Sequence, residues 1–417
     1  MGMLYDNNAT GFETNLASRH RRGKFWHYIY TGSTGLGIVA LALLLLNILN
    51  SAFGYAAVQN KIEREELAIN GYSIEVLHKD DLVYILESNI PGGVFRRLAS
   101  EKPFEARSRA EVYELVIEWV VEPDVVHTWS LVESLTQKRR IQAEMATLYQ
   151  EAELQFISWL DGDFLTVPQS STAEKAGVRT ALLGSLLVII ITILFAFPLG
   201  VGAAIYLQEY ADARKRINQF IQTNINNLAC VPSIIYGILG LAIFVRALEP
   251  LTSGALFGIE ADRTTANGRT ILSAGLTLGV LILPLVIINA QEAIKAVPNS
   301  LRLASYGLGG TRWQTVWHHI LPGALPGILT GAILSISRAV GETAPLVVIG
   351  ASTFITADPE GPFSKFTVLP IQIYQWTSRP QAEFRNIAAA AILVLLFLLL
   401  TLNAAAILLR NRYSKRL

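Results

Sequence analysis

Six long apolar runs constrain the fold of this chain more than any other feature. Each run reaches roughly the 20 residues that a helix needs to cross the hydrocarbon core of a bilayer. A helix also satisfies its own backbone hydrogen bonds in lipid, which an open strand cannot do. The sequence therefore predicts an all-α integral membrane protein with six transmembrane helices, at residues 36–58, 178–207, 225–248, 271–290, 323–349 and 386–409.

Charged residues are few and unevenly distributed. They make up 16% of the chain, against about 25% in soluble domains. The segment 1–35 and the tail 411–417 are basic, whereas residues 59–175 hold 21 acidic and 12 basic side chains, a balance of −9. The positive-inside rule predicts cytoplasmic termini, an extracytoplasmic insertion at 59–177 and a core of five further spans at 178–410.

The first apolar run has an alternative interpretation as a cleaved signal peptide. Such a peptide has an apolar core of about 7–15 residues, and the run at 36–58 is longer and follows a long basic lead. We therefore expect it to remain as the first transmembrane helix.

The insertion is predicted to be largely helical. Helical spacing of apolar residues suggests helices at 74–88, 110–121 and 130–160, with a turn at 90–93 and a helix end before Pro123. The acidic excess fits either a solvated surface or a docking surface for a soluble partner, and the sequence leaves both open.

The stretch 299–349 changes character at Pro322. Its first half is polar and predicts a helix at 299–319 on the cytoplasmic surface of the membrane. Its second half predicts a spanning helix that carries Arg338 and Glu342 near its middle. A charged side chain at mid-bilayer costs at least about 2.5 kcal/mol by insertion scales, so such residues usually face the bundle interior or an aqueous path.

The polar half resembles the cytoplasmic loop of binding-protein-dependent ABC importer permeases. That loop runs Glu-Ala-Ala, three residues, Gly, nine residues, Ile, any residue, Leu-Pro. Gly309 and Leu321-Pro322 match it, whereas Leu303 stands at the Glu position, Ser305 at the second Ala and His319 at the Ile. The departures weaken any claim about a polar contact from Leu303, but they keep the helix-turn-helix outline.

Neighbouring segments narrow the resemblance to phosphate-importer permeases of the PstA type. The matching segments, in order along the chain, are A-G-V at 176–178, V-P-S-I-I-Y-G at 231–237, V-P-N-S-L-R at 297–302, G-G-T-R-W-Q-T-V at 309–316, L-P-G-A-L-P-G-I at 321–328 and R-A-V-G-E-T-A-P-L at 338–346. The A-P-L at 344–346 favours the PstA type over the partner permease, the PstC type. The resemblance covers roughly 160–410 and the first span, but not the insertion.

The resemblance implies a MetI-like permease of a bacterial plasma (inner) membrane that moves phosphate by alternating access. It implies a heterodimer with a PstC-type permease, two PstB-type ATPase subunits that bind ATP and magnesium, and a PstS-type phosphate-binding protein. This chain would then be a transport subunit without enzymatic activity or a cofactor of its own. Accordingly, it has no G-x-x-x-x-G-K-[ST] phosphate loop. The net charge of +1 gives no reason to expect nucleic acid.

The candidate substrate path contains Arg338, Glu342 and Ser335. Arg338 and Glu342 are four residues apart and share a helix face, and Ser335 lies on the same face. A guanidinium offers planar paired donors that suit a phosphate oxyanion, and Glu342 would hold it and offset its charge. The alternative is a structural ion pair between two permease subunits.

The candidate ATPase-coupling residues lie on the predicted surface helix. Small residues there permit close approach, and Arg302 and Arg312 are expected to pair with acidic groups on the ATPase. The candidate residues are Arg302, Leu303, Ala304, Ser305, Gly309 and Arg312. The alternative is an interfacial amphipathic helix that touches lipid headgroups through Trp313 and Trp317.

Three other functions remain compatible with parts of the sequence. An importer of another oxyanion, sulfate or molybdate, would use the same arginine chemistry. A membrane sensor or scaffold would bind partners without moving solute, and a channel is disfavoured because no pore-lining ring repeats. No catalytic constellation or metal-ligand set is expected. His318 and His319 are adjacent and diverge by about 100° on a helix, and Cys230 is the single cysteine.

Overall fold

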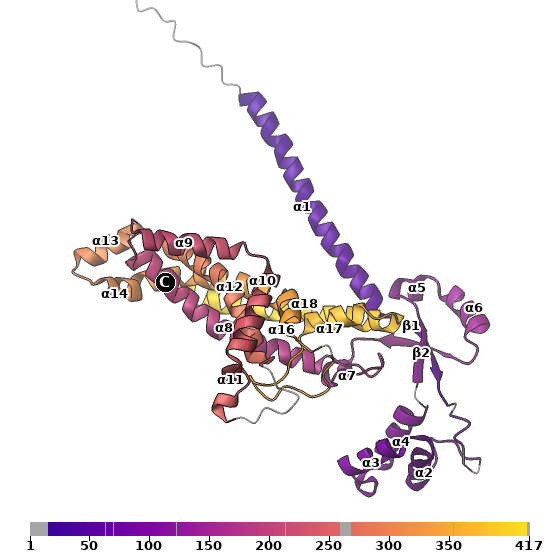
Figure 1. Cartoon of the computed structure of the whole chain (residues 1–417). Helices are drawn as coiled ribbons and strands as arrows, with labels where there is room; N and C mark the ends of the chain where they lie inside the picture. The colour runs from indigo at the N-terminus through magenta and orange to yellow at the C-terminus, as the bar shows by residue number, and fades with distance from the viewer. Residues whose placement is uncertain are drawn as a thin grey trace, which may run out of the picture.

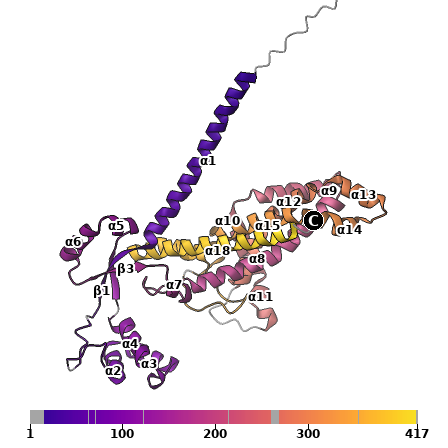
Figure 2. The same cartoon turned by 180° about the vertical axis from the view of Figure 1, so that it is seen from behind.

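The computed structural model describes residues 16–62, 64–69, 71–121, 123–212, 214–258, 268–352 and 354–414. Expectations for residues 1–15, for the middle of the loop at 259–267 and for Lys415 and Arg416 lie outside the described residues. The described chain is mostly helical (Figure 1), with a helical bundle, an insertion at one end of it and a long first helix that leans away from the bundle in both views (Figure 2).

Five helices are long and apolar enough to cross a membrane, and a bent pair of helices makes a sixth candidate span. The prediction of six spans therefore holds when the bent pair is counted as one broken span. The five are α1 Leu16–Ala52, α8 Arg179–Ile205, α12 Ile271–Lys295, α15 Leu321–Gly341 and α18 Ala382–Ser414.

Helix α12 lies at the centre of the bundle. It packs against α8 and α15, and glycines let the backbones approach closely. A side chain added at Gly279 would lie 2.6 Å from the ring of Phe195 on α8, and one at Gly331 of α15 would lie 2.4 Å from Asn289. Small residues therefore set the separation of these helices.

The insertion contains an antiparallel sheet that the sequence analysis did not predict. The strands are in the order β2-β1-β3: β1 Phe53–Asn60, β2 Pro123–Thr128 and β3 Glu153–Ser158. The first spanning helix was predicted to reach residue 58, but it ends at Ala52. Its last apolar residues instead form the central strand, because pairing with two neighbouring strands satisfies their backbone groups outside the membrane.

The predicted helix at 130–160 is wrong. A capping box between Ser130 and Glu133 starts a short helix there, and Gln137 then leaves helical geometry. Residues 153–158 pair with β1, which overrides their helical spacing. The elements in this part are α5 Leu131–Thr136, α6 Lys138–Leu148 and α7 Gly162–Thr166.

A second part of the insertion is helical and has its own apolar core. The prediction at 110–121 is confirmed by α4 and the π-helical turn η2, and the prediction at 74–88 by a helix that starts later. The turn predicted at 90–93 is shorter, because Gly92 already starts α3. These elements are α2 Lys79–Asn89, α3 Gly92–Glu101, η1 Phe104–Ala106, α4 Arg109–Val116 and η2 Ile117–Val121.

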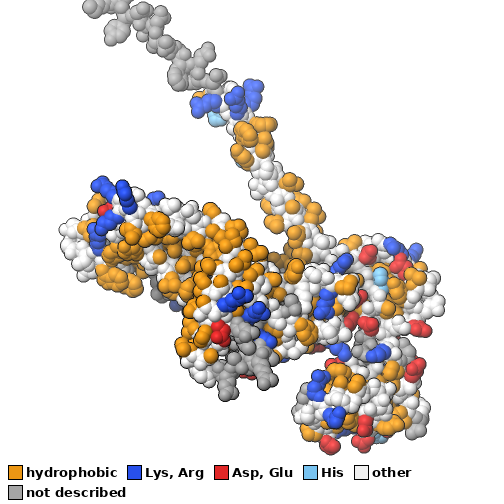
Figure 3. All heavy atoms as spheres, in the orientation of Figure 1, with side chains coloured by type: hydrophobic (Ala, Val, Ile, Leu, Met, Phe, Trp, Pro, Cys, Tyr) orange, Lys and Arg blue, Asp and Glu red, His pale blue; other side chains and the backbone are white. Residues whose placement is uncertain are grey.

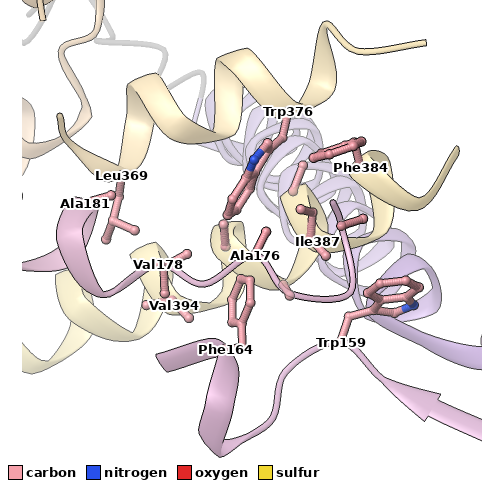
Figure 4. Close-up of a cluster of buried hydrophobic side chains, with 14 of the residues drawn as sticks. Trp159, Phe164, Ala176, Val178, Ala181, Leu369, Trp376, Phe384, Ile387 and Val394 are labelled. Carbon is pink, nitrogen blue, oxygen red and sulfur yellow. The ribbon is translucent and has the colours of Figure 1, made fainter. Parts of the chain in front are cut away.

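An apolar cluster joins the insertion to the bundle (Figure 4). Trp159 and Phe164 come from the insertion, whereas Trp376 comes from α17 Leu369–Thr377 and Ile387 from α18. Acidic side chains gather over the insertion and apolar ones over the bundle and α1. Basic side chains gather at the free end of α1 and at the bundle end that carries α13 (Figure 3).

The third span is broken. Helices α9 Arg216–Ala229 and α10 Ser233–Gly240 meet at 105°, and the π-helical η4 Leu241–Ala247 continues α10. Pro232 causes the break because it has no N–H to donate and disfavours helix in the residue before it. The hydroxyl of Tyr236 donates to the carbonyl of Leu228 at 2.7 Å, which satisfies one backbone group freed at the break.

The fifth span is broken as well. The helix predicted at 323–349 ends at Gly341, Glu342 is extended (ψ 108°), and α16 Ala344–Ile349 follows. Pro345 lacks the N–H that would continue the helix. The remaining short elements, between the third and fourth candidate spans, are α11 Glu249–Thr252 and η5 Ala255–Phe257.

The single surface helix predicted at 299–319 is also wrong. Two short helices replace it, with a turn between them in which Gly309 has φ +82°. Only glycine adopts this conformation without strain. The elements are α13 Asn299–Gly307, α14 Arg312–Thr315 and the π-helical η6 Val316–Ile320, which leads directly into α15. We call α13, α14 and η6 the hairpin.

Candidate functional site

The two breaks in the spanning helices meet near the middle of the bundle. Gly237 of α10 lies against Pro345 of α16, where an added Cβ would be 2.7 Å from the proline Cα. Ala339 of α15 packs in one cluster with Ile282 and Tyr236. Because Ile282 is near the midpoint of α12, the breaks lie at about half the depth of the bundle. Discontinuous helices at this depth are typical of substrate sites in transporters.

Arg338 and Glu342 lie at the break in the fifth span. Arg338 is in the last turn of α15 and Glu342 caps its end. The Nε of Arg338 donates to Oε1 of Glu342 at 3.2 Å, and the two side chains are 45% and 18% exposed. The helix C-terminus carries partial negative charge, which favours a cation there by about 0.3–1 kcal/mol. A guanidinium has five N–H donors, so donors beyond the one used by Glu342 face the surface of the bundle.

Ser335 does not join this pair. It is buried, and its hydroxyl donates to the carbonyl of Gly331 at 2.9 Å. The structure thus brings Arg338 and Glu342 together and leaves Ser335 in the helix packing one turn below. The contribution of Tyr236 and Pro345 was not predicted from the sequence, although Pro232 and Pro345 are a sequence signal for the two breaks.

A polar groove of about 450 Å³ lies between α9 and α12. The amides of Gln222 and Gln291 donate to each other across it, at 3.2 and 2.8 Å. The groove is also lined by Asn218 and Thr223 of the same face of α9. The sequence analysis did not single out this face, because its polar residues fitted a helix end equally well.

The hairpin presents an apolar surface. Leu303 is 64% exposed and Leu308, at the turn, is 92% exposed. Trp313 and Trp317 stack with their ring centroids 5.5 Å apart. Ala304 and Arg312 are exposed, and no atom lies within 4 Å of a Cβ placed on Gly309. This surface is therefore open to a partner.

Two predicted coupling residues face inward instead. Ser305 is buried and its hydroxyl is 2.8 Å from that of Thr315, a hydrogen bond that holds the two arms of the hairpin together. Arg302 was expected to pair with acidic groups on a partner, but in this structure its guanidinium is directed into the chain. It forms an ion pair with Glu209 of the same chain at 2.7 Å.

Within the part of the chain that the structure describes, no group of three or more His, Cys, Asp or Glu side chains is arranged to hold a metal ion. Cys230 is exposed next to the break in the third span. The imidazole of His318 lies 3.1 Å from the carbonyl of Gln314 on its own helix.

Residues 196–417 match the family model of the binding-protein-dependent transport system inner membrane component. The probable ABC transporter permease protein YqgI of Bacillus subtilis (strain 168) is 32% identical over 278 residues, which cover 63% of this chain and 88% of that protein. The phosphate transport system permease protein PstA 1 of Mycobacterium tuberculosis (strain ATCC 25618 / H37Rv) is 36% identical, with 58% of this chain and 71% of that protein covered. The phosphate transport system permease protein PstA of Yersinia pestis is 34% identical, with 57% and 74% covered.

Solved structures are similar at lower identity. An inward-facing MetNI methionine ABC transporter shares 20% identity, with a TM-score of 0.40 over 57% of this chain and 94% of that chain. A bacterial ABC transporter that imports the acidic polysaccharide alginate shares 17% identity, with a TM-score of 0.39 over 67% of this chain and 91% of that chain.

Proposed function

Since the chain belongs to the family of binding-protein-dependent transport system inner membrane components, we propose that it is the membrane permease subunit of an ATP-driven phosphate importer. The relatives named as phosphate transport permeases support the choice of phosphate. The single observation that carries the proposal is the exposed arginine at the mid-depth break of the fifth span.

The assembly that we propose pairs this chain with a related permease of the PstC type. Two ATPase subunits of the PstB type bind the cytoplasmic side, where they supply ATP and magnesium chemistry that this chain lacks. A phosphate-binding protein of the PstS type docks on the outer side. The basic ends of α1 and α18 then lie in the cytoplasm of a bacterial cell, by the positive-inside rule, and the acidic insertion lies outside.

Arg338 is the proposed contact for the anion. A guanidinium at mid-bilayer costs about 2.5–3.5 kcal/mol on insertion scales unless it faces water or protein. Its half-exposed position on the surface of a single subunit therefore fits a path shared with a second permease. Glu342 competes for the same guanidinium, so it offsets the charge when the path is empty and yields when an oxyanion binds. Ser335 supports the packing of the turn that carries Arg338.

Release to the cytoplasm follows the polar groove on α9. Amide side chains such as Gln222 and Gln291 offer N–H donors to an anion without the strong binding of a fixed positive charge. Weak sites of this kind let a solute leave. The groove thus continues the path below the break.

The exposed surface of the hairpin is the proposed ATPase contact. Leu303, Ala304, Leu308 and Arg312 are exposed there, and Gly309 shapes the turn. Leu303 stands where related loops carry a glutamate, so the contact rests on apolar burial and on shape. Alternating access then follows when the ATPase dimer closes and moves the hairpin.

Reconstitution tests this function. The chain is assembled in proteoliposomes with its permease partner, ATPase and binding protein, and ATP hydrolysis is measured with phosphate or sulfate outside. We expect phosphate to stimulate hydrolysis and sulfate to have no effect. Stimulation by sulfate or molybdate alone would assign the chain to another oxyanion importer. Assembly with an ATPase that no solute stimulates would favour a sensor or scaffold.

A further inference from the structure

The hairpin is tied to the membrane bundle by one buried ion pair. Arg302 of α13 contacts Glu209, which lies 93 residues earlier in the chain. The side chains are 14% and 6% exposed, and the closest N–O distance is 2.7 Å. A second guanidinium nitrogen, Nε, is 3.2 Å from the same carboxylate oxygen. A paired arginine–carboxylate contact of this kind fixes orientation as well as distance.

The same arginine also holds the end of α12. Its terminal nitrogens donate to the carbonyls of Ile294 at 2.9 Å and Val297 at 2.7 Å. The last carbonyls of a helix have no partner within the helix and carry partial negative charge. Arg302 therefore caps α12 while it binds Glu209, and one side chain joins three separate segments.

Glu209 lies on a π-helical turn, η3 Tyr206–Tyr210, which continues α8 directly. The turn ends with the N–H of Ala211 donating to the carbonyl of Tyr206 at 2.9 Å. Turns of this kind appear frequently at functional sites. The carboxylate is thus attached to the inner end of α8, and the arginine to the hairpin.

We propose that Arg302 and Glu209 form the joint through which the hairpin moves α8 and α12 as one unit. This inference rests on the proposed transport function. Apolar contacts of Val316 and Ile320 with Ile294 and Val297 also hold the hairpin, but apolar packing has no fixed direction and permits sliding. The ion pair and its carbonyl contacts have direction, so they convert a push on the hairpin into rotation of the two helices. Arg302 and Glu209 are positioning residues, because neither contacts solute or nucleotide.

A lysine cannot replace this arginine. Its ammonium is a single point on a flexible stem, whereas the guanidinium reaches a carboxylate and two carbonyls in one plane. The variants Arg302→Lys, Arg302→Gln and Glu209→Gln therefore all break the joint. A matched control is Arg140→Gln, which removes an exposed pair with Glu144 (2.8 Å) in the insertion.

The first test measures the ATP hydrolysed per phosphate imported in the reconstituted complex. We expect this ratio to rise about tenfold in each single variant, a common size for coupling between sites. The double variant Arg302→Gln/Glu209→Gln should show the same ratio as either single variant, and the control should match the wild type. If hydrolysis and uptake fall together so that the ratio is unchanged, the pair is only structural and the proposal is overturned.

The second test does not require transport. Spin labels at the exposed positions Ser300→Cys on α13 and Tyr210→Cys on η3, in a Cys230→Ser background, report the distance between the hairpin and η3 in the assembled complex. We expect a narrow distance distribution in the otherwise native complex that ATP leaves unchanged, and a distribution that broadens with ATP in Arg302→Lys. An unchanged distribution in that variant would overturn the joint. Failure of the native complex to import phosphate would instead overturn the transport function alone.

Discussion

Two arginine–glutamate pairs in the membrane bundle share their chemistry but differ in exposure and in the distance between their partners. Arg338 and Glu342 are four residues apart, 3.2 Å at closest, and the arginine is 45% exposed. Arg302 and Glu209 are 93 residues apart, 2.7 Å at closest, and both are nearly buried. The exposed pair keeps donors available for a ligand, whereas the donors of the buried arginine are used within the chain. Exposure and partner distance, rather than residue type, therefore separate a binding group from a structural joint.

Measuring the stability of variants tests most directly whether the two pairs differ. Removing one partner of a buried pair leaves an uncompensated charge and costs about 3–5 kcal/mol. We expect Arg302→Gln to lower the free energy of unfolding by about 3 kcal/mol. Arg338→Gln, with a partner screened by solvent, should change it by less than about 1 kcal/mol. Denaturant unfolding of the detergent-solubilised chain measures both changes. Equal losses of unfolding free energy would show that the two pairs contribute equally to stability, against this account.

The turn between the arms of the hairpin gives the next largest effect. Gly309 has φ +82°, a conformation that costs an L-residue roughly 1–2 kcal/mol. We expect Gly309→Val to lower stability by about that amount and to raise the ATP hydrolysed per phosphate imported. The matched control is Gly307→Ala, where a side chain meets open space. If Gly309→Val hydrolyses as little ATP per imported phosphate as the native chain, the turn is not part of the ATPase contact.

Removing the carboxylate of Glu342 tests what this residue does in the exposed pair. Glu342→Gln takes away the competitor of a bound anion, and an exposed pair contributes at most about 1 kcal/mol. We expect the apparent KM for phosphate to fall by up to about fivefold, with a lower maximal rate because release is slower. Uptake kinetics in proteoliposomes test this. A higher KM would mean that Glu342 positions the arginine for phosphate instead of competing with it.

The smallest effect concerns a carboxyl outside both pairs. Glu174 lines a cavity of about 550 Å³ where the insertion meets the bundle. Burial raises its pKa, and the nearby carboxylates of Asp124 and Glu383 raise it further. As the pH rises above the ordinary value of 4.5, the unfolded chain releases this proton first. Stability therefore falls until the pH passes the raised pKa of the folded protein.

Glu174→Gln removes the loss of stability that deprotonation of this carboxyl causes as the pH rises. We expect the variant to be more stable than the native chain at pH 7, by less than about 1 kcal/mol because solvent screens a partly exposed residue. The two should converge below pH 4. Thermal melts of the detergent-solubilised chain between pH 4 and 7 measure the difference, and a constant offset across that range would contradict the titration of Glu174.

The spans and the insertion could be predicted because their signals are local. Long apolar runs specify spanning helices, and the acidic block at 59–175 marks the insertion. Phe53–Asn60 shows where this fails: its apolar residues fit a helix equally well, and only pairing with β2 and β3 makes it a strand. The breaks at Pro232 and Pro345 had a sequence signal, but it did not reveal that the two breaks meet.

Only those contacts of the site whose residues lie close in the sequence could be predicted. Arg338 and Glu342 were paired because they are four residues apart. Arg302 was expected to pair with a partner subunit, whereas Glu209 becomes its neighbour only when η3 and α13 meet in the folded chain. Contacts over such separations depend on tertiary packing, which periodicity does not encode.

The central claim is that Arg338 contacts phosphate during transport. The most direct test is phosphate uptake into proteoliposomes that contain the full complex with Arg338→Gln or Arg338→Lys. The account predicts that the Gln variant loses uptake by about 100-fold while it still assembles with the ATPase, since a charged hydrogen bond of about 3 kcal/mol is lost. The Lys variant keeps the charge without the paired donors and should retain part of the activity. Native uptake by a correctly assembled Arg338→Gln complex would contradict the account.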